Sequence, residues 1–141
     1  MRGIEFRGKI VGAEGFVYGK LLAPLASGNA YIAYDVNEVR SFVYISRSEK
    51  VDSETVGQYT GLKDKNGKKI FEGDIVINSK GQIGYIAFLI QEAGFVVVLK
   101  NSDYSLGHRN TNECYERATH HKIIGNIHEN PELMEGTVNE K

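Results

Sequence analysis

The chain of 141 residues contains no tryptophan, two prolines and one cysteine, Cys114. With no second cysteine in the sequence, Cys114 has no partner for an internal disulfide. Hydrophobic residues make up 41% of the chain, which is enough for a modest core without a disulfide or a metal. Because disulfides persist mainly in oxidising compartments, this cysteine usage favours a reducing cytoplasm.

Long apolar runs are also missing. The longest ones, such as YIAFLI at 85–90, are far shorter than the roughly 20 residues that span a bilayer as a helix. The first residues, MRGIEFRGKI, lack the apolar stretch of a secretory signal peptide. We therefore expect neither membrane insertion nor export by a classical route.

The net charge is nearly zero, −1, with 17 Lys+Arg against 18 Asp+Glu. Proteins dedicated to duplex DNA are usually strongly basic, because neutralising phosphates supplies much of their affinity. The charge balance argues against that class of protein and leaves room only for a local basic patch.

Glycine is abundant, and the sixteen glycines separate short apolar or alternating segments. This spacing is typical of a β-rich chain with many tight turns, and no segment keeps a helical apolar period over three turns. The expected strands are 4–9, 16–20, 31–34, 42–45, 74–78, 82–90, 95–100 and 122–128. The expected turns and loops are 11–15, 46–50 (SRSEK), 78–81, 91–94 and the long polar segment 101–114.

A few short helical turns complete the expected elements. Asp52 or Ser53 can cap a turn at 52–56, and Asn130 with Pro131 has the composition of a helix start. A further helical turn is expected at 114–119.

The order of the expected elements predicts a mainly β fold with few short helices. Three meander strands between 74 and 100, with Gly84 marking a bend or bulge in the middle one, and a late return strand indicate a small SH3-like barrel. A flat sheet packed on another element is the alternative. We expect an N-terminal β section at 1–56, the barrel section at 57–134 and a frayed tail at 135–141, with the two sections possibly packed as one compact unit.

Three segments resemble the YopX family of phage and prophage proteins. They are MRGIEFRGK with the following FVYGKLL, the long central segment 51–76, and IIGNIHENPELM at 123–134. Ser53 and Phe16 depart from the family, which often has proline and tryptophan there. The resemblance implies a β-rich protein encoded by a mobile element of bacteria, with no established enzymatic activity and no catalytic residue to assign.

The basic loop, which we define as residues 63–69, is the first candidate site. It contains four lysines and one aspartate, a local charge of +3. Glycines beside lysines can contact phosphates, and a nearby tyrosine can stack on a base. The candidate binding surface therefore consists of Tyr59, Lys63, Lys65, Lys68 and Lys69.

The spacing of this segment favours a simpler interpretation. Gly61 and Gly67 are separated by five residues, whereas a phosphate-binding P-loop has four and continues with Lys-Ser or Lys-Thr. Asn66-Gly67 is a strong signal for a hairpin turn. A turn with solvated lysines is therefore the leading expectation for the basic loop.

Two other groups carry reactive side chains. Glu72 and Asp74 are two residues apart, but Gly73-Asp74 is better explained as a turn whose carboxylate accepts backbone amides. The histidines and the cysteine of the last third do not have paired zinc-ligand spacing: His108, Cys114, His120, His121 and His128. We expect no metal, no cofactor and no catalytic residue.

The sequence thus predicts a non-enzymatic phage or prophage accessory protein of the YopX type, acting in the cytoplasm of a bacterial host cell by binding a macromolecule. A protein partner or a homo-oligomer is the first expectation, because exposed edges of a β-rich chain accept further strands. A nucleic-acid-binding module using the basic loop is the alternative, and a small enzyme or metal protein is a distant third. No small-molecule substrate is inferred.

Overall fold

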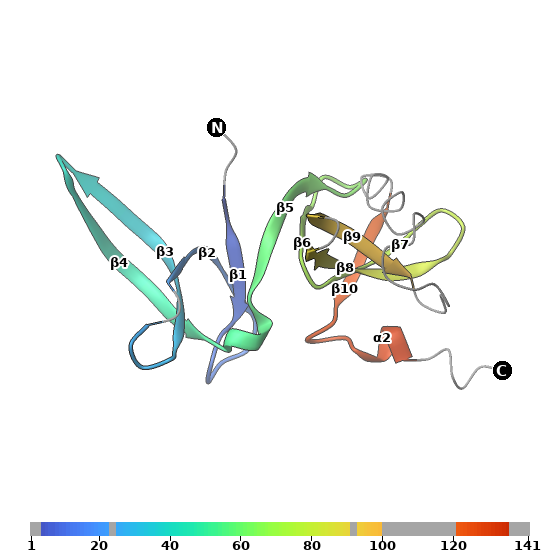
Figure 1. Ribbon diagram of the computed structural model, residues 1–141, viewed down its shortest axis with the longest axis horizontal. Helices are drawn as coiled ribbons and strands as arrows, with labels where there is room; N and C mark the ends of the chain where they lie inside the picture. Colours follow the sequence, from blue (N-terminus) through green and yellow to red (C-terminus); the bar gives the residue numbers. More distant parts are fainter. Residues whose placement is uncertain (1–3, 23–24, 91–92, 100–120, 136–141) are drawn as a thin grey trace. The chain divides into compact units, whose positions relative to one another are not determined.

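The computed structural model describes residues 4–22, 25–90, 93–99 and 121–135, and the predicted mainly β class is confirmed (Figure 1). The chain divides into two compact units between Tyr59 and Thr60, each described by itself below. Among the described residues, no helix is long and apolar enough to cross a membrane.

The first unit is an antiparallel meander. Its strands are β1 (Phe6–Lys9), β2 (Phe16–Leu22), β3 (Ala30–Val39) and β4 (Phe42–Val51), hydrogen-bonded in the order β4-β3-β2-β1. Lys9 pairs with Phe16, so the predicted loop at 11–15 closes a β-hairpin. On its other side, β1 pairs with the first residues of β5 (Gly57–Lys63).

The core of this unit lies at the base of β3 and β4. Ala30, Ile32 and Val51 are buried, and partly buried apolar side chains of β1 and β2 pack on them. Gly19 lets β2 approach β3 closely, because a Cβ at this position would lie 2.2 Å from the carbonyl oxygen of Ala33. The sheet is therefore tightly packed up to Ala33, where the pairing of β2 with β3 ends.

The predicted loop at 46–50 is wrong, because these residues continue β4 in pairing with β3. Serine and charged residues are depleted in strands generally, which is why the composition indicated a loop. At the edge of a sheet such side chains point into water while the backbone completes the ladder. Both predicted strands, 31–34 and 42–45, are consequently parts of strands of ten residues.

The short helical elements are confirmed at two of the three expected places. Ser53–Thr55 forms a 3-10 turn, η1, and Asp52 Oδ1 accepts from the Glu54 amide at 3.1 Å. The helix α2 (Glu132–Glu135) follows Asn130 and Pro131. The turn expected at 114–119 and the long loop at 101–114 lie outside the described residues.

The second unit contains the predicted meander. The later half of β5 neighbours β6 (Lys69–Phe71), and a four-stranded antiparallel sheet has the order β10-β7-β8-β9. The strands of that sheet are β7 (Asp74–Ile77), β8 (Ile83–Leu89), β9 (Gly94–Leu99) and β10 (Lys122–Asn126). All four lie within one or two residues of their predicted bounds. The SH3-like barrel itself stays a prediction.

The core of the second unit is aliphatic. Ile70, Val76, Ile86 and Val97 are buried side by side. Of the bend or bulge predicted at Gly84, the bulge is wrong, since β8 keeps a continuous register with β7 and β9. Glycine is needed there for a close approach instead, because a Cβ would lie 2.7 Å from the Val98 carbonyl oxygen.

Candidate interaction surfaces

The outer part of the β3–β4 hairpin, residues 34–47, is a two-stranded arm. The register of β2 with β3 ends at Lys20 opposite Ala33, and β3 continues to Val39 with only β4 beside it in the described structure. Figure 1 shows β3 and β4 extending together beyond the ends of β1 and β2. Along the arm, the outer edges of both strands are therefore open to further strands.

Two bulges mark the base of the arm. Ala33 pairs with Ser48 and Asp35 with Arg47, which leaves Tyr34 as an extra residue on β3. Val36 then pairs with Ile45, which leaves Ser46 as an extra residue on β4. Bulges bend a ribbon and increase its twist. One bulge on each strand restores the register, and regular pairing resumes in the outer arm.

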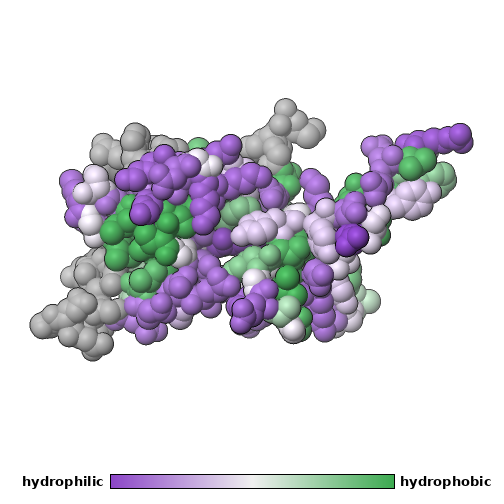
Figure 2. Space-filling model, turned by 180° about the vertical axis from the view of Figure 1, so that it is seen from behind, coloured by the Kyte–Doolittle hydropathy of each residue, from purple (hydrophilic) through white to green (hydrophobic). Residues whose placement is uncertain are grey.

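The outer arm, which we define as residues 36–45, carries apolar side chains on both of its faces. Val36 and Ile45 form one cross-strand pair, and the next apolar pair, Val39 with Phe42, lies on the opposite face. Figure 2 shows hydrophobic (green) residues open to solvent on this arm. Phe42 and Val43 each keep 64% of their surface exposed, and the other four keep between 42% and 53%: Val36, Val39, Tyr44 and Ile45.

The strand FVYI at 42–45 is predicted from the sequence, but its exposure to solvent is not. Four consecutive apolar residues give a strand two apolar faces, a pattern that is usual for a strand buried on both sides. The same pattern arises when the faces of a strand bind another molecule. Only the structure shows that no layer of the described chain covers this strand.

The basic loop connects β5 and β6 and contains a three-residue hairpin turn, residues 65–67. The Asp64 amide donates to the Lys68 carbonyl at 2.8 Å, and the Gly67 amide donates to the Asp64 carbonyl at 2.9 Å. Gly67 has a φ of 84°, which favours glycine. The predicted turn is confirmed, with three connecting residues rather than the two of the commonest Asn-Gly hairpin.

Asp64 organises this loop from inside. Its side chain is buried, and Oδ1 accepts from the amides of Asn66 at 2.8 Å and Lys68 at 2.9 Å. Oδ2 accepts from the Ile123 amide of β10 at 3.0 Å. Burial is the largest influence on the pKa of Asp64 and raises it, but these three amides and the charge of Lys68 together hold the pKa below its ordinary value.

A second hairpin of the same unit repeats this arrangement with asparagine. The Asn78 amide donates to the Gln82 carbonyl, and Asn78 Oδ1 accepts from the amides of Lys80 and Gln82, each at 2.9 Å. Asn78 Nδ2 donates to Oε1 of Gln82, four positions away, whereas Asp64 Oδ2 contacts β10. The sequence signal Asx-x-x-Gly thus predicts the local turn but not the long-range contact.

All four lysines of the candidate surface lie on the β5–β6 hairpin with exposed side chains. Lys63 ends β5, Lys69 begins β6, and the other two belong to the connection. The fifth candidate, Tyr59, is half-buried, and its amide donates to the Glu5 carbonyl at 2.8 Å. Tyr59 belongs to the first unit and the lysines to the second.

The remaining candidates have structural roles or lie outside the described residues. Asp74 is buried, and its Oδ2 accepts from the Phe71 amide at 2.7 Å across the turn at Gly73, as predicted. His121 is buried and His128 half-buried. No group of three potential metal ligands occurs among the residues that the structure describes. His108, Cys114 and His120 lie outside them.

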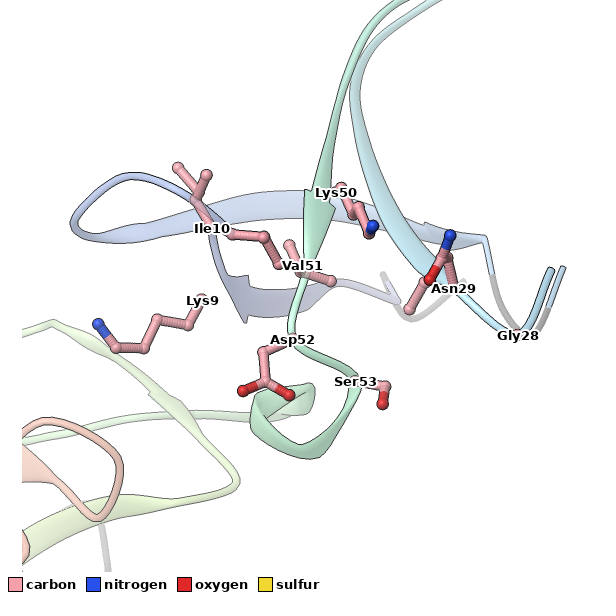
Figure 3. A pocket seen from close by; sticks show the side chains of 10 residues that line it. Lys9, Ile10, Gly28, Asn29, Lys50, Val51, Asp52 and Ser53 are labelled. Atoms are coloured by element: carbon pink, nitrogen blue, oxygen red, sulfur yellow. The ribbon is translucent and has the colours of Figure 1, made fainter.

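A pocket of about 440 Å³ lies in the first unit, between the β1–β2 turn and the base of β3 and β4 (Figure 3). In Figure 3 the side chains of Lys9 and Lys50 extend in different directions. Asp52 at its edge caps η1. Its polar groups do not converge on one point, so the pocket defines no particular ligand chemistry.

These features describe a mainly β protein of two compact units with a long, apolar, solvent-exposed hairpin arm. The chain belongs to the YopX protein family, whose model matches residues 5–135. It is similar to the crystal structure of protein EF1440 from Enterococcus faecalis, with 22% sequence identity and a TM-score of 0.59 over 95% of this chain and 99% of that one. At this identity the likeness shows a common fold. The search of curated proteins gave no match.

Proposed function

We propose that the chain is a non-enzymatic accessory protein of a phage or prophage that acts in the bacterial cytoplasm by binding a protein through its β3–β4 arm. The exposed apolar arm is the observation that carries this proposal. Family membership supports the phage setting through the resemblance described above.

An arm that stays exposed on both faces is unfavourable in water. Isolated two-stranded hairpins are at best marginally stable in water, and large exposed apolar patches are rare on monomers. The arm also has open strand edges, which bind extended segments by strand addition. A ribbon with these properties is stabilised when a partner covers it.

The test compares the capture of proteins from phage-infected cells by the wild type and by an arm variant with Phe42→Thr and Val43→Thr. Threonine keeps a high strand propensity while removing apolar surface on both faces. The matched control replaces two other exposed apolar residues, which lie outside the arm, Ile4→Thr and Val11→Thr. We expect a protein from these cells to bind the wild type and the control but not the arm variant. Once that protein is purified, its affinity should show the same difference between the control and the arm variant. Equal binding by the arm variant overturns the proposal.

The basic loop supports a second candidate function, nucleic-acid binding. The only acid of residues 63–69, Asp64, is buried and hydrogen-bonded, so the solvent-exposed charges of the loop are those of its lysines. Binding by up to four phosphate contacts would weaken about 100-fold between about 50 and 200 mM salt.

Fluorescence anisotropy with single- and double-stranded oligonucleotides tests this candidate. We expect Lys68→Glu with Lys69→Glu to abolish binding. Lys80→Glu is the matched control, because Lys80 occupies the loop with the same hydrogen-bond pattern. Absence of binding by the wild type at low salt rejects the candidate.

A further inference from the structure

We propose that the occupant of the arm is the arm of a second copy of this chain, so that the protein is a two-fold symmetric dimer joined along β4. This inference rests on the proposed binding role of the arm and specifies its partner. Three observations carry it: the amount of apolar surface, the charge of the arm and the nature of its edges.

The apolar surface of one arm is suited to an identical partner. The six exposed apolar side chains of its outer part, residues 36–45, leave on the order of 600 Å² of apolar surface open to solvent, and patches of this size mark interaction sites. Pairing along β4 covers the flanks of these side chains and gives each of them an apolar neighbour across the strand pair, while the faces of the joined ribbon stay open. A second arm thus supplies apolar cross-strand neighbours together with backbone hydrogen bonds.

The charges of the arm are self-complementary. Residues 34–47 contain two acids and two bases, which cancel: Asp35, Glu38, Arg40 and Arg47. Asp35 and Arg47 lie 3.8 Å apart within one arm. Two copies of the arm therefore meet without net repulsion, whereas a strongly charged partner would gain no net electrostatic attraction from the neutral arm.

Along the apolar stretch 42–45, the outer edge of β4 is open and carries no charged residue or proline. Natural edge strands are often guarded by lysine or proline, and residues 34–47 contain neither. β4 is the end strand of its sheet and is bridged on its outer edge at Val51, by Ile10, whereas β3 is covered by β2 as far as Ala33. The bulge at Ser46 confines regular pairing to the apolar stretch 42–45.

Symmetry decides how two such edges combine. A two-fold axis perpendicular to the sheet makes the two β4 strands antiparallel, and both copies use the same edge. This arrangement pairs the outer β4 edge of each copy and is complete with two copies. A head-to-tail arrangement would leave one edge open for a further copy. The stretch 42–45 of one chain then lies beside the same stretch of the other.

Sedimentation or light scattering of the full chain at micromolar concentrations tests the dimer. We expect wild type to have twice the mass of one chain. Replacing Val43→Lys places a guarding charge beside the axis and should weaken dimerisation at least about tenfold. Val11→Lys adds the same charge outside the arm and should leave the dimer intact. Circular dichroism establishes that each variant is folded.

A gain-of-signal measurement does not depend on a variant losing the dimer. In a Cys114→Ser background, Tyr44→Cys should be coupled between copies by a short bismaleimide, and Val11→Cys should not. A dimer that persists in Val43→Lys, or no coupling at Tyr44→Cys, overturns the placement of the interface. A strictly monomeric wild type overturns the second-copy inference, while capture of another protein by the arm would still uphold the function proposed above.

Discussion

At the residue scale, short polar side chains that bind nearby backbone amides fix much of this fold. Asp52, Asp74 and Asn78 each accept an amide within four residues, and these caps and turns are readable from the sequence because donor and acceptor are close along the chain. Asp64 also reaches the amide of Ile123, 59 positions away. No local pattern predicts that contact, because it depends on how β10 returns to the β5–β6 hairpin.

Asp64→Asn is expected to lower the free energy of unfolding by about 1–3 kcal/mol, the cost of an unsatisfied buried donor. Both carboxylate oxygens accept amides, so the amide group of asparagine places a donor against a donor in either orientation. Asn78→Asp is the matched control, because both backbone amides bind one oxygen there and the Nδ2 contact that is lost is with the exposed side chain of Gln82, so its effect should stay below about 0.5 kcal/mol. Urea titration measures both, and equal effects would contradict this assignment.

The stabilising effect of Asp64 should also depend on pH. Its pKa is lowered in the folded state, so the folded chain binds fewer protons than the unfolded chain between the two pKa values. The contribution is therefore complete above the unfolded pKa of about 3.9 and is lost as pH falls through the folded value. The stability difference between wild type and Asp64→Asn should shrink with acid below about pH 4. A difference that is independent of pH would show that ionisation of Asp64 does not matter.

At the scale of elements, the sequence predicted which segments form strands better than how far they extend. The apolar cores of β7, β8 and β9 are visible in the sequence because their side chains alternate or run together between glycines. The end of β4 is not visible, because residues 46–50 are polar and their strand conformation comes from pairing with β3. The exposure of the arm is not readable either, since its apolar residues have the composition of a core.

The close packing of β2 against β3 makes a prediction at this scale. Gly19→Ala should lower stability by about 1–3 kcal/mol, because the new methyl group meets the Ala33 carbonyl of the neighbouring strand. The control is Gly12→Ala, where no atom lies within 4 Å and only the positive φ opposes alanine, at a cost of about 1 kcal/mol. Thermal or urea unfolding compares the two, and a smaller effect at Gly19 would mean that the strands separate easily.

At the scale of the whole molecule, the arm is expected to contribute little to the stability of one chain and more to the stability of the dimer. Phe42 and Val43 contribute little to the folded monomer because they are mostly exposed, so Phe42→Thr with Val43→Thr should change its stability by less than about 0.5 kcal/mol. In a dimer paired along β4 the flanks of the same side chains are covered, and mass action then raises the melting temperature of the wild type with protein concentration. The melting temperature of the variant should stay constant over the same range. If wild type and variant respond alike to concentration, the arm does not join two copies.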